Sequence, residues 1–289
     1  MAPFTDTHAH LDFPDFAADL DAVVERAAAA GVRRIISIGT TLEASRRAVA
    51  LAERFPCVYA AVGWHPCHVM EAPEDVRPGL RELLGHPKVA AIGECGLDRY
   101  RRPGTETGKS PADDEAYMAK QRVVFQQQLE LAAEAGLNVV VHQRAAFAET
   151  LAMMEAFRGR VRGVFHCFTG TPGEVAKVLA AGSLVSFTGI TTFKNAQNVR
   201  DALAAAPTGQ FMLETDCPYL APVPYRGKRC EPAYVRELAE FVAALKGLTA
   251  AEFSTATERA AEEFFPRLRG GDASSPQAVC AATAQPEGH

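Results

Sequence analysis

Two histidines separated by one residue stand near the start of the chain, in the stretch Thr5-Asp6-Thr7-His8-Ala9-His10-Leu11-Asp12. Side chains alternate between the two faces of a strand, so His8 and His10 point the same way only if this stretch is extended. Two imidazoles on one face can bind a metal ion. A pair of solvent-facing histidines would show the same spacing, so a metal site requires ligands from elsewhere in the chain.

Further residues of the types that bind metals follow apolar segments later in the chain. They are Glu94, His142, His166 and Asp216. Any one of them alone is explained more simply as a hydrogen-bonded loop residue. Together with the first two histidines they supply four imidazoles and two carboxylates, which is more than one ion needs and is typical of a two-metal site with one bridging acid. Burying so many ionisable groups without an ion would be costly.

The elements that must position these residues alternate along the chain. Apolar segments rich in β-branched residues predict strands, and amphipathic segments predict helices. The first predicted strand is a short one after Phe4, and the others are Val32–Ile38, Val58–Val62, Val89–Gly93, Asn138–Val141, Val161–Phe165, Leu184–Thr188 and Phe211–Leu213. The predicted helices are Phe16–Ala30, Leu42–Phe55, Pro73–Leu84, Tyr117–Ala135, Ala146–Phe157, Pro172–Ala181, Asn198–Ala205, Pro232–Lys246 and Thr249–Phe265.

Eight strands that alternate with helices predict a parallel sheet. Their number and the chain length favour an α/β fold of the (β/α)8 TIM barrel type, as a single domain over residues 1–268. An open, doubly wound sheet is the alternative, but it would require a glycine-rich turn after the first strand. In a barrel, catalytic residues lie at the C-terminal ends of the strands, where the candidate ligands fall. Residues 269–289 lack periodicity and are predicted to form a disordered tail.

The composition excludes some classes of protein. The chain of 289 residues is 48% hydrophobic with a formal net charge of -5, so it lacks the basic field of a nucleic-acid coat protein, and any contact with phosphate must be local. No apolar segment approaches the length of about 18 residues that spans a membrane. The first residues, Met1-Ala2-Pro3-Phe4, have neither the basic nor the apolar region of a secretory signal, so we expect a cytoplasmic protein without membrane contact. A monomer is favoured.

A set of motifs runs in a fixed order across residues 4–265. After the first histidine pair these are Gly63-Trp64-His65-Pro66, Ile92-Gly93-Glu94-Cys95-Gly96-Leu97-Asp98-Arg99-Tyr100, His142-Gln143-Arg144-Ala145-Ala146, His166-Cys167-Phe168-Thr169-Gly170 and Glu214-Thr215-Asp216-Cys217-Pro218-Tyr219-Leu220-Ala221-Pro222. In this order the motifs resemble the TatD family of metal-dependent hydrolases, within the amidohydrolase-like barrels.

The resemblance implies two divalent metal ions. One would be held by His8, His10 and Asp216, the second by His142 and His166, and both by a bridging Glu94. Mixed imidazole and carboxylate ligands suit Zn²⁺, Mn²⁺ or Fe²⁺, whereas activity in the family is usually associated with Mg²⁺.

The resemblance also implies roles in catalysis and substrate binding. Glu94 and Asp216 are the expected catalytic residues, and Asp216 would orient or deprotonate the attacking water. His65, Arg144 and Lys194 are candidates for contacts to a substrate phosphate, although Lys194 could also be an ordinary solvated loop lysine.

The implied activity is a deoxyribonuclease that cleaves DNA phosphodiester bonds through a metal-activated water, on single strands or 3′ ends. Two alternatives stay open. The same activated water could hydrolyse an ester or amide, as in a D-aminoacyl-tRNA deacylase, or the barrel could be a non-catalytic binding protein. Basic clusters at 99–102 and 226–229 could guide a nucleic acid, and Tyr100 or Trp64 could stack a base. Such clusters more commonly serve solubility alone, and that alternative stays open.

The chain departs from the family pattern at three places. Cys230 replaces an asparagine, Gln143 replaces a small serine, and residues 102–114 are predicted to form a longer loop beside the site. These differences could change substrate preference without changing the metal ligands.

Overall fold

The computed structural model describes residues 2–108 and 110–270. Its strands are β1 (Phe4–Ala9), β2 (Val32–Ile38), β3 (Val58–Val62), β4 (Val89–Asp98), β5 (Val139–Arg144), β6 (Gly163–Phe165), β7 (Leu184–Phe187) and β8 (Phe211–Leu213). The α-helices are α1 (Leu20–Ala29), α2 (Leu42–Arg54), α3 (Arg77–Leu83), α4 (Pro103–Thr107), α5 (Pro111–Ala135), α6 (Phe147–Glu155), α7 (Pro172–Ala180), α8 (Gln197–Ala205), α9 (Val235–Lys246) and α10 (Ala250–Phe264). Short 3-10 helices are η1 (Pro14–Phe16), η2 (Pro66–Glu71), η3 (Gly189–Thr192), η4 (Pro232–Tyr234) and η5 (Pro266–Gly270).

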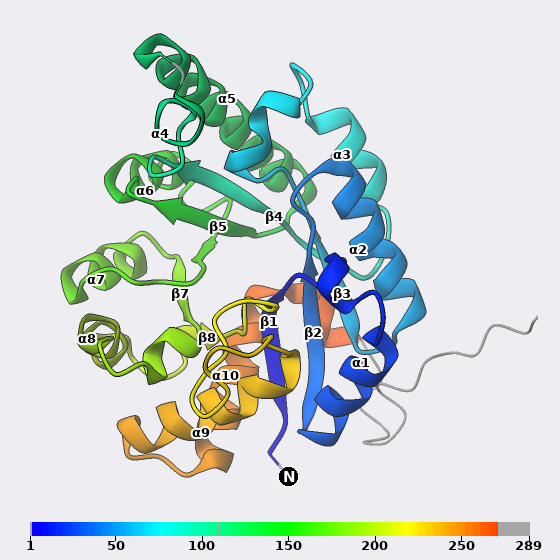
Figure 1. The fold of residues 1–289 in the computed structure, drawn as a ribbon, viewed down its shortest axis with the longest axis vertical. Helices are drawn as coiled ribbons and strands as arrows, with labels where there is room; N and C mark the ends of the chain where they lie inside the picture. The colour runs from blue at the N-terminus through cyan, green and yellow to red at the C-terminus, as the bar shows by residue number, and fades with distance from the viewer. Residues whose placement is uncertain (1, 109, 271–289) are drawn as a thin grey trace, which may run out of the picture.

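The eight strands form one parallel sheet in which spatial order follows chain order, and helices surround it (Figure 1). Beyond the end of β8 the chain meets β1 again: Ala9 forms a parallel bridge with Cys217, and Asp216 N donates to His8 O at 2.9 Å. The sheet is therefore nearly closed into the predicted single-domain (β/α)8 barrel. The open-sheet alternative is wrong, because an open sheet would leave the first and last strands apart.

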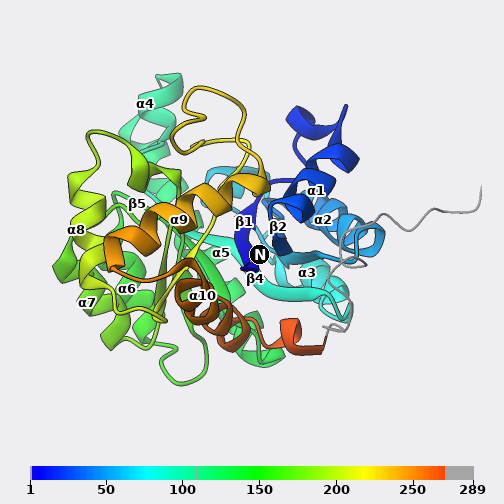
Figure 2. The same ribbon diagram turned by 90° about the horizontal axis from the view of Figure 1, so that it is seen from below.

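One end of the barrel interior is filled by apolar side chains. The last turn of α10 supplies Phe264, and Phe265 follows it; both are fully buried and belong to the same hydrophobic cluster as Ile36 of β2 and Val140 of β5. In the view from below, α10 lies close to β1 at the end of the barrel where the chain begins (Figure 2). The C-terminal helix thus covers the N-terminal ends of the strands and leaves the opposite end for polar groups.

The predicted loop over residues 102–114 is wrong, because it contains α4 and the first turn of α5. The long helix begins at Pro111, where Ser110 Oγ accepts from Asp113 N and the Asp113 carboxylate accepts from Ser110 N. This reciprocal capping, with proline at the first helical position, stabilises a helix start well before the predicted Tyr117.

Other element boundaries differ more modestly. β4 continues past Gly93 to Asp98, and the helix expected at 73–84 is shortened to α3. Within the described ranges, no helix is long and apolar enough to cross a membrane. The tail predicted from residue 269 lies outside the described residues, apart from the last two residues of η5.

Candidate metal centre

All six predicted ligands converge at the C-terminal ends of the strands. His8 lies in β1 and His10 directly after it, and Glu94 lies in β4. The others lie in β5 or directly after β6 and β8, namely His142, His166 and Asp216. None of the six side chains is more than 15% exposed. The alternation of side chains in β1 places both of its histidines on the inner side, as their spacing predicted.

Four ligand atoms surround a first common point. His8 Nε2 lies 3.3 Å from His10 Nε2, 3.5 Å from Glu94 Oε2 and 3.6 Å from Asp216 Oδ1. His10 Nε2 lies 3.8 Å from Glu94 Oε2 and 3.4 Å from Asp216 Oδ1. In tetrahedral coordination, ligand atoms that each lie about 2.1 Å from the ion lie about 3.4 Å from one another. The four atoms therefore fit a divalent cation. Without a cation between them, the lone pairs of the two facing imidazole nitrogens would repel each other.

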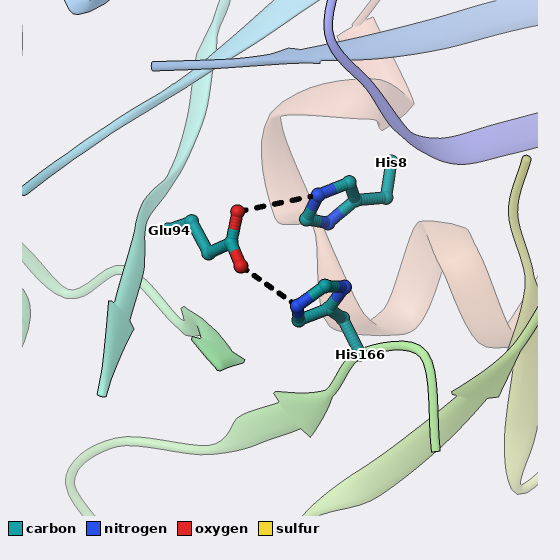
Figure 3. Close-up of side chains that lie close together, drawn as sticks. All are labelled: His8, Glu94 and His166. Carbon is teal, nitrogen blue, oxygen red and sulfur yellow. Dashed lines mark ion pairs between the residues drawn. The ribbon is translucent and has the colours of Figure 1, made fainter. Parts of the chain in front are cut away.

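The second oxygen of Glu94 faces a different group of imidazoles. Glu94 Oε1 lies 2.7 Å from His166 Nε2, 2.9 Å from His142 Nδ1 and 3.4 Å from His65 Nε2. In Figure 3 the two carboxylate oxygens point to His8 and to His166 on separate sides. Glu94 thus presents one oxygen to each of two groups of histidines, which is the geometry expected of a bridging carboxylate.

The chain reaches this arrangement through a close approach of two strands. Gly93 has a φ of 141°, and a Cβ at this position would lie 2.7 Å from Val140 O of the neighbouring β5. Only glycine adopts this backbone region readily and leaves room for the contact. Gly93 therefore allows β4 to turn the side chain of Glu94 into the mouth of the barrel.

The electrostatic environment of this cluster favours positive charge. Burial alone would raise the pKa of Glu94, but the nearby His166 and His65 and a hydrogen bond from His142 hold it well below its usual range. Burial would lower the pKa of His166, but the charge of Glu94 raises it well above the usual value. The pKa values of Glu94 and Asp216 are lowered and that of His166 is raised, so the carboxylates stay ionised and attract positive charge, as expected where a cation belongs.

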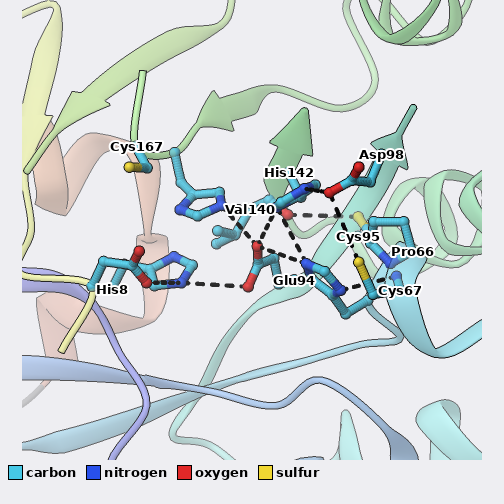
Figure 4. Close-up of polar contacts among 12 residues, drawn as sticks. His8, Pro66, Cys67, Glu94, Cys95, Asp98, Val140, His142 and Cys167 are labelled. Carbon is cyan, nitrogen blue, oxygen red and sulfur yellow. Dashed lines mark hydrogen bonds and ion pairs between the residues drawn. The ribbon is translucent and has the colours of Figure 1, made fainter. Parts of the chain in front are cut away.

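Three buried carboxylates behind the cluster were not assigned a role from the sequence. Asp98 Oδ2 lies 3.1 Å from His142 Nε2, on the side of the ring away from Glu94 (Figure 4). Glu214 accepts from Cys167 N and from Ser186 Oγ, and lies 3.6 Å from His166 Nδ1. The third, Asp6, accepts from the backbone and hydroxyl groups of Thr215 and so joins β1 to the segment after β8.

Strand periodicity contains the signal for Asp98, and the position directly after β8 contains the signal for Glu214. Asp98 follows Glu94 by four positions on one strand, so both side chains face the same side. Glu214 precedes Asp216 by two positions. Carboxylates that accept a hydrogen bond from a metal-binding histidine fix the orientation and tautomer of its ring.

The three predicted substrate contacts lie in different environments. His65 belongs to the cluster itself, with Nε2 3.2 Å from His142 Nδ1, and burial lowers its pKa to about 4. Arg144 lies at the exposed end of β5, with its guanidinium 3.8 Å from the centre of the Tyr100 ring. Lys194 is exposed in the connection between η3 and α8 and lines a cavity there.

The two predicted basic clusters differ in how their charges are used. In the first, Arg99 forms an ion pair with Glu149 at 2.8 Å, and its two arginine neighbours also face carboxylates. In the second, Arg229 pairs with Asp19 at 2.7 Å, whereas Arg226 contacts the ring of an aromatic residue instead. Arg99 and Arg229 therefore form close ion pairs that connect separate segments, whereas Arg226 has no carboxylate partner among the described residues.

Comparisons with known proteins agree over nearly the whole chain. Residues 5–266 match the family described as TatD related DNase. The uncharacterized metal-dependent hydrolase YabD of Bacillus subtilis is 38% identical over 90% of this chain and 98% of its own length. The 3′-5′ ssDNA/RNA exonuclease TatD of Enterobacter lignolyticus is 35% identical over 90% of this chain and 98% of its own length. The crystal structure of YjjV, a TatD homolog from Escherichia coli, has a TM-score of 0.83 at 28% identity and covers 92% of this chain and 98% of that one.

Proposed function

This chain belongs to the TatD-related DNase family of metal-dependent hydrolases, and we propose that it hydrolyses phosphodiester bonds of DNA, on single strands or at 3′ ends. The observation that carries the proposal is the position of Glu94, whose two oxygens face two separate groups of histidine nitrogens. The relatives named as exonucleases for single-stranded DNA and RNA support this choice of substrate.

The proposed assignment of ligands follows from the two groups. His8, His10 and Asp216 would hold one cation. His142 and His166 would hold a second, and Glu94 would contribute to both. Two divalent cations at such a site lower the pKa of a bound water and neutralise charge on the phosphate. Imidazoles and carboxylates together fit Zn²⁺, Mn²⁺ or Fe²⁺ better than Mg²⁺, which prefers oxygen ligands.

Asp216 is the residue that we assign to receive the proton from the attacking water. Its side chain is 15% exposed, against 3% for Glu94, so it faces the mouth of the barrel where water and substrate enter. Its Oδ1 lies toward His8 and His10, and Oδ2 is the oxygen assigned to take the proton. Glu94 is enclosed and positions the two groups relative to each other.

His65 is proposed to donate a hydrogen bond rather than to bind a cation. Its Nδ1 accepts from Cys67 N at 3.0 Å, and its pKa of about 4 keeps the ring neutral at neutral pH. The single ring proton of a neutral imidazole then lies on Nε2, which faces the cluster. An N–H in this place can contact a phosphate oxygen, and Arg144 and Lys194 would add positive charge outside the cluster.

A substrate panel on metal-stripped protein tests the proposal. Zn²⁺, Mn²⁺, Fe²⁺ and Mg²⁺ are added back singly, with single-stranded DNA, duplex DNA, RNA and a D-aminoacyl-tRNA as substrates. We expect metal-dependent cleavage of single-stranded DNA that is lost in Glu94→Gln. The matched control is Glu240→Gln, which changes a carboxylate on α9 that pairs with Arg236.

The other outcomes of this panel have definite meanings. Turnover of the aminoacyl ester with intact DNA would replace the nuclease by the ester-hydrolase alternative. Tight binding of nucleic acid without turnover under any ion would favour a non-catalytic barrel.

A further inference from the structure

A cavity of about 530 Å³ lies on the same face of the barrel as the candidate metal centre. It is lined by the connections that follow β6, β7 and β8 and by the first turn of α8, and two of these connections also carry His166 and Asp216. Thr192 Oγ1 accepts from Val223 N at 2.9 Å and so ties the second of the connections to the third. The volume is within the range of small-molecule sites and large enough for part of a nucleotide.

The charges that line this cavity are of one sign. Lys194 and Arg226 both line it, and none of the lining residues is acidic. In the part of the chain that the structure describes, neither of these two side chains has a carboxylate partner. A second cavity beside α1 is different, because Arg47 there pairs with Asp12. Two cations near each other without an acid attract an anion from solution.

The remaining lining suits the other parts of a nucleotide. The Arg226 guanidinium lies 3.9 Å from the centre of the Phe193 ring, which holds its planar fork in one orientation. Asn195 and Asn198 add side-chain amides, and Val223 is 52% exposed at the rim. Cations can hold the phosphate, amides can bond a base edge and apolar surface can contact the face of the base, so the lining can hold a nucleotide of a single strand.

We infer that this cavity is a subsite for a nucleotide of a single-stranded nucleic acid, removed from the bond that is cleaved, with its phosphate held by Lys194 and Arg226. The inference rests on the proposed nuclease function and adds a contact that holds the strand beyond the metal centre. Because the contact is to phosphate and base, it discriminates between long and short substrates.

The test measures binding rather than turnover. A fluorescent phosphorothioate 15-mer of thymidine, which resists cleavage, is titrated with the holoenzyme at several salt concentrations. The double variant Lys194→Gln/Arg226→Gln is compared with Lys177→Gln/Arg259→Gln, which removes the same charges from α7 and α10. We expect the first variant to raise Kd about tenfold and to reduce the slope of log Kd against log salt by about 0.7, because the two side chains hold one phosphate and each phosphate contact to a single strand contributes about 0.7.

Each outcome supports or overturns the subsite. Equal salt slopes for wild type and both variants would overturn it, and an equal loss in both variants would show that net charge alone matters. Cleavage by the wild type, measured separately on phosphodiester DNA, tests the proposed function. If the protein binds with the expected salt slope but cleaves no DNA, the subsite proposal stands and the nuclease proposal is wrong.

Discussion

Replacing Asp98 by asparagine changes one atom in a residue that touches no proposed cation. Asp98 Oδ1 accepts from Tyr100 N at 2.9 Å and Arg101 N at 2.8 Å, and Oδ2 faces His142 Nε2 at 3.1 Å. The asparagine oxygen must stay with the two backbone N–H groups, because its amide nitrogen can only donate. The NH2 group then faces His142, which has to accept the hydrogen bond at Nε2.

This hydrogen bond moves the ring proton to the wrong nitrogen. A neutral imidazole that accepts at Nε2 carries its proton on Nδ1, and Nδ1 of His142 is the atom 2.9 Å from Glu94 Oε1. A protonated Nδ1 offers no lone pair to a cation. Loss of such orienting carboxylates weakens metal binding about 10- to 100-fold, which corresponds to about 1.4 to 2.7 kcal/mol.

The assay is calorimetric titration of metal-stripped protein with Mn²⁺, with Asp201→Asn on the surface of α8 as the control. We expect Asp98→Asn to weaken one binding event and to leave the event at His8 and His10 unchanged. Unchanged affinity for both ions, or equal weakening of both, would refute the assignment of His142 to one of two distinct sites. Unaltered thermal unfolding of the metal-stripped variant shows that the effect does not come from misfolding.

Three other perturbations have expected results. Removing the metals with a chelator should lower Tm by at least about 5 °C in a thermal scan, because ions that bind only the folded state add about 2.7 kcal/mol each at 100 times Kd. Gly93→Ala should destabilise the protein by about 2 to 4 kcal/mol in urea unfolding and reduce metal content, since its Cβ meets Val140 O. Hydrogen bonds from Arg229 lower the pKa of Asp19 to about 2 from 3.8, so the pair stabilises the fold above pH 3.8 and loses its effect as the pH falls toward 2. Urea unfolding of Asp19→Asn should therefore differ from wild type at pH 6 and converge with it near pH 2.

The barrel and the convergence of the candidate ligands could be predicted from the sequence because both follow from local patterns. An apolar segment such as Val139–Val141 predicts a buried strand, and parallel strands bring their C-terminal residues together. His142 and His166 therefore meet although 24 positions separate them in the chain. No tertiary information is needed for this step, since the fold class alone supplies it.

The features that the sequence did not reveal depend on contacts between distant elements. The arginines after β4 look like a nucleic-acid patch, yet Arg99 finds Glu149 on α6, which no local pattern indicates. The early start of α5 at Pro111 depends on the cap at Ser110, and composition alone does not show that this cap outweighs the effect of the glycine and proline nearby. Asp98 was missed because β4 continues further than its apolar segment.

The charges at the mouth of the barrel link metal binding to substrate binding. The chain carries a net charge of -5, and two of its ionised carboxylates lie at the place where the phosphate of the proposed substrate would bind. Arg144, Lys194 and Arg226 lie on the same face without an ion-paired carboxylate among the described residues, and they oppose this field only in part. Two divalent cations would reverse the sign at Glu94 and Asp216. Nucleic acid should therefore bind tightly only when the metals are present, so that the ions which activate the water also admit the substrate.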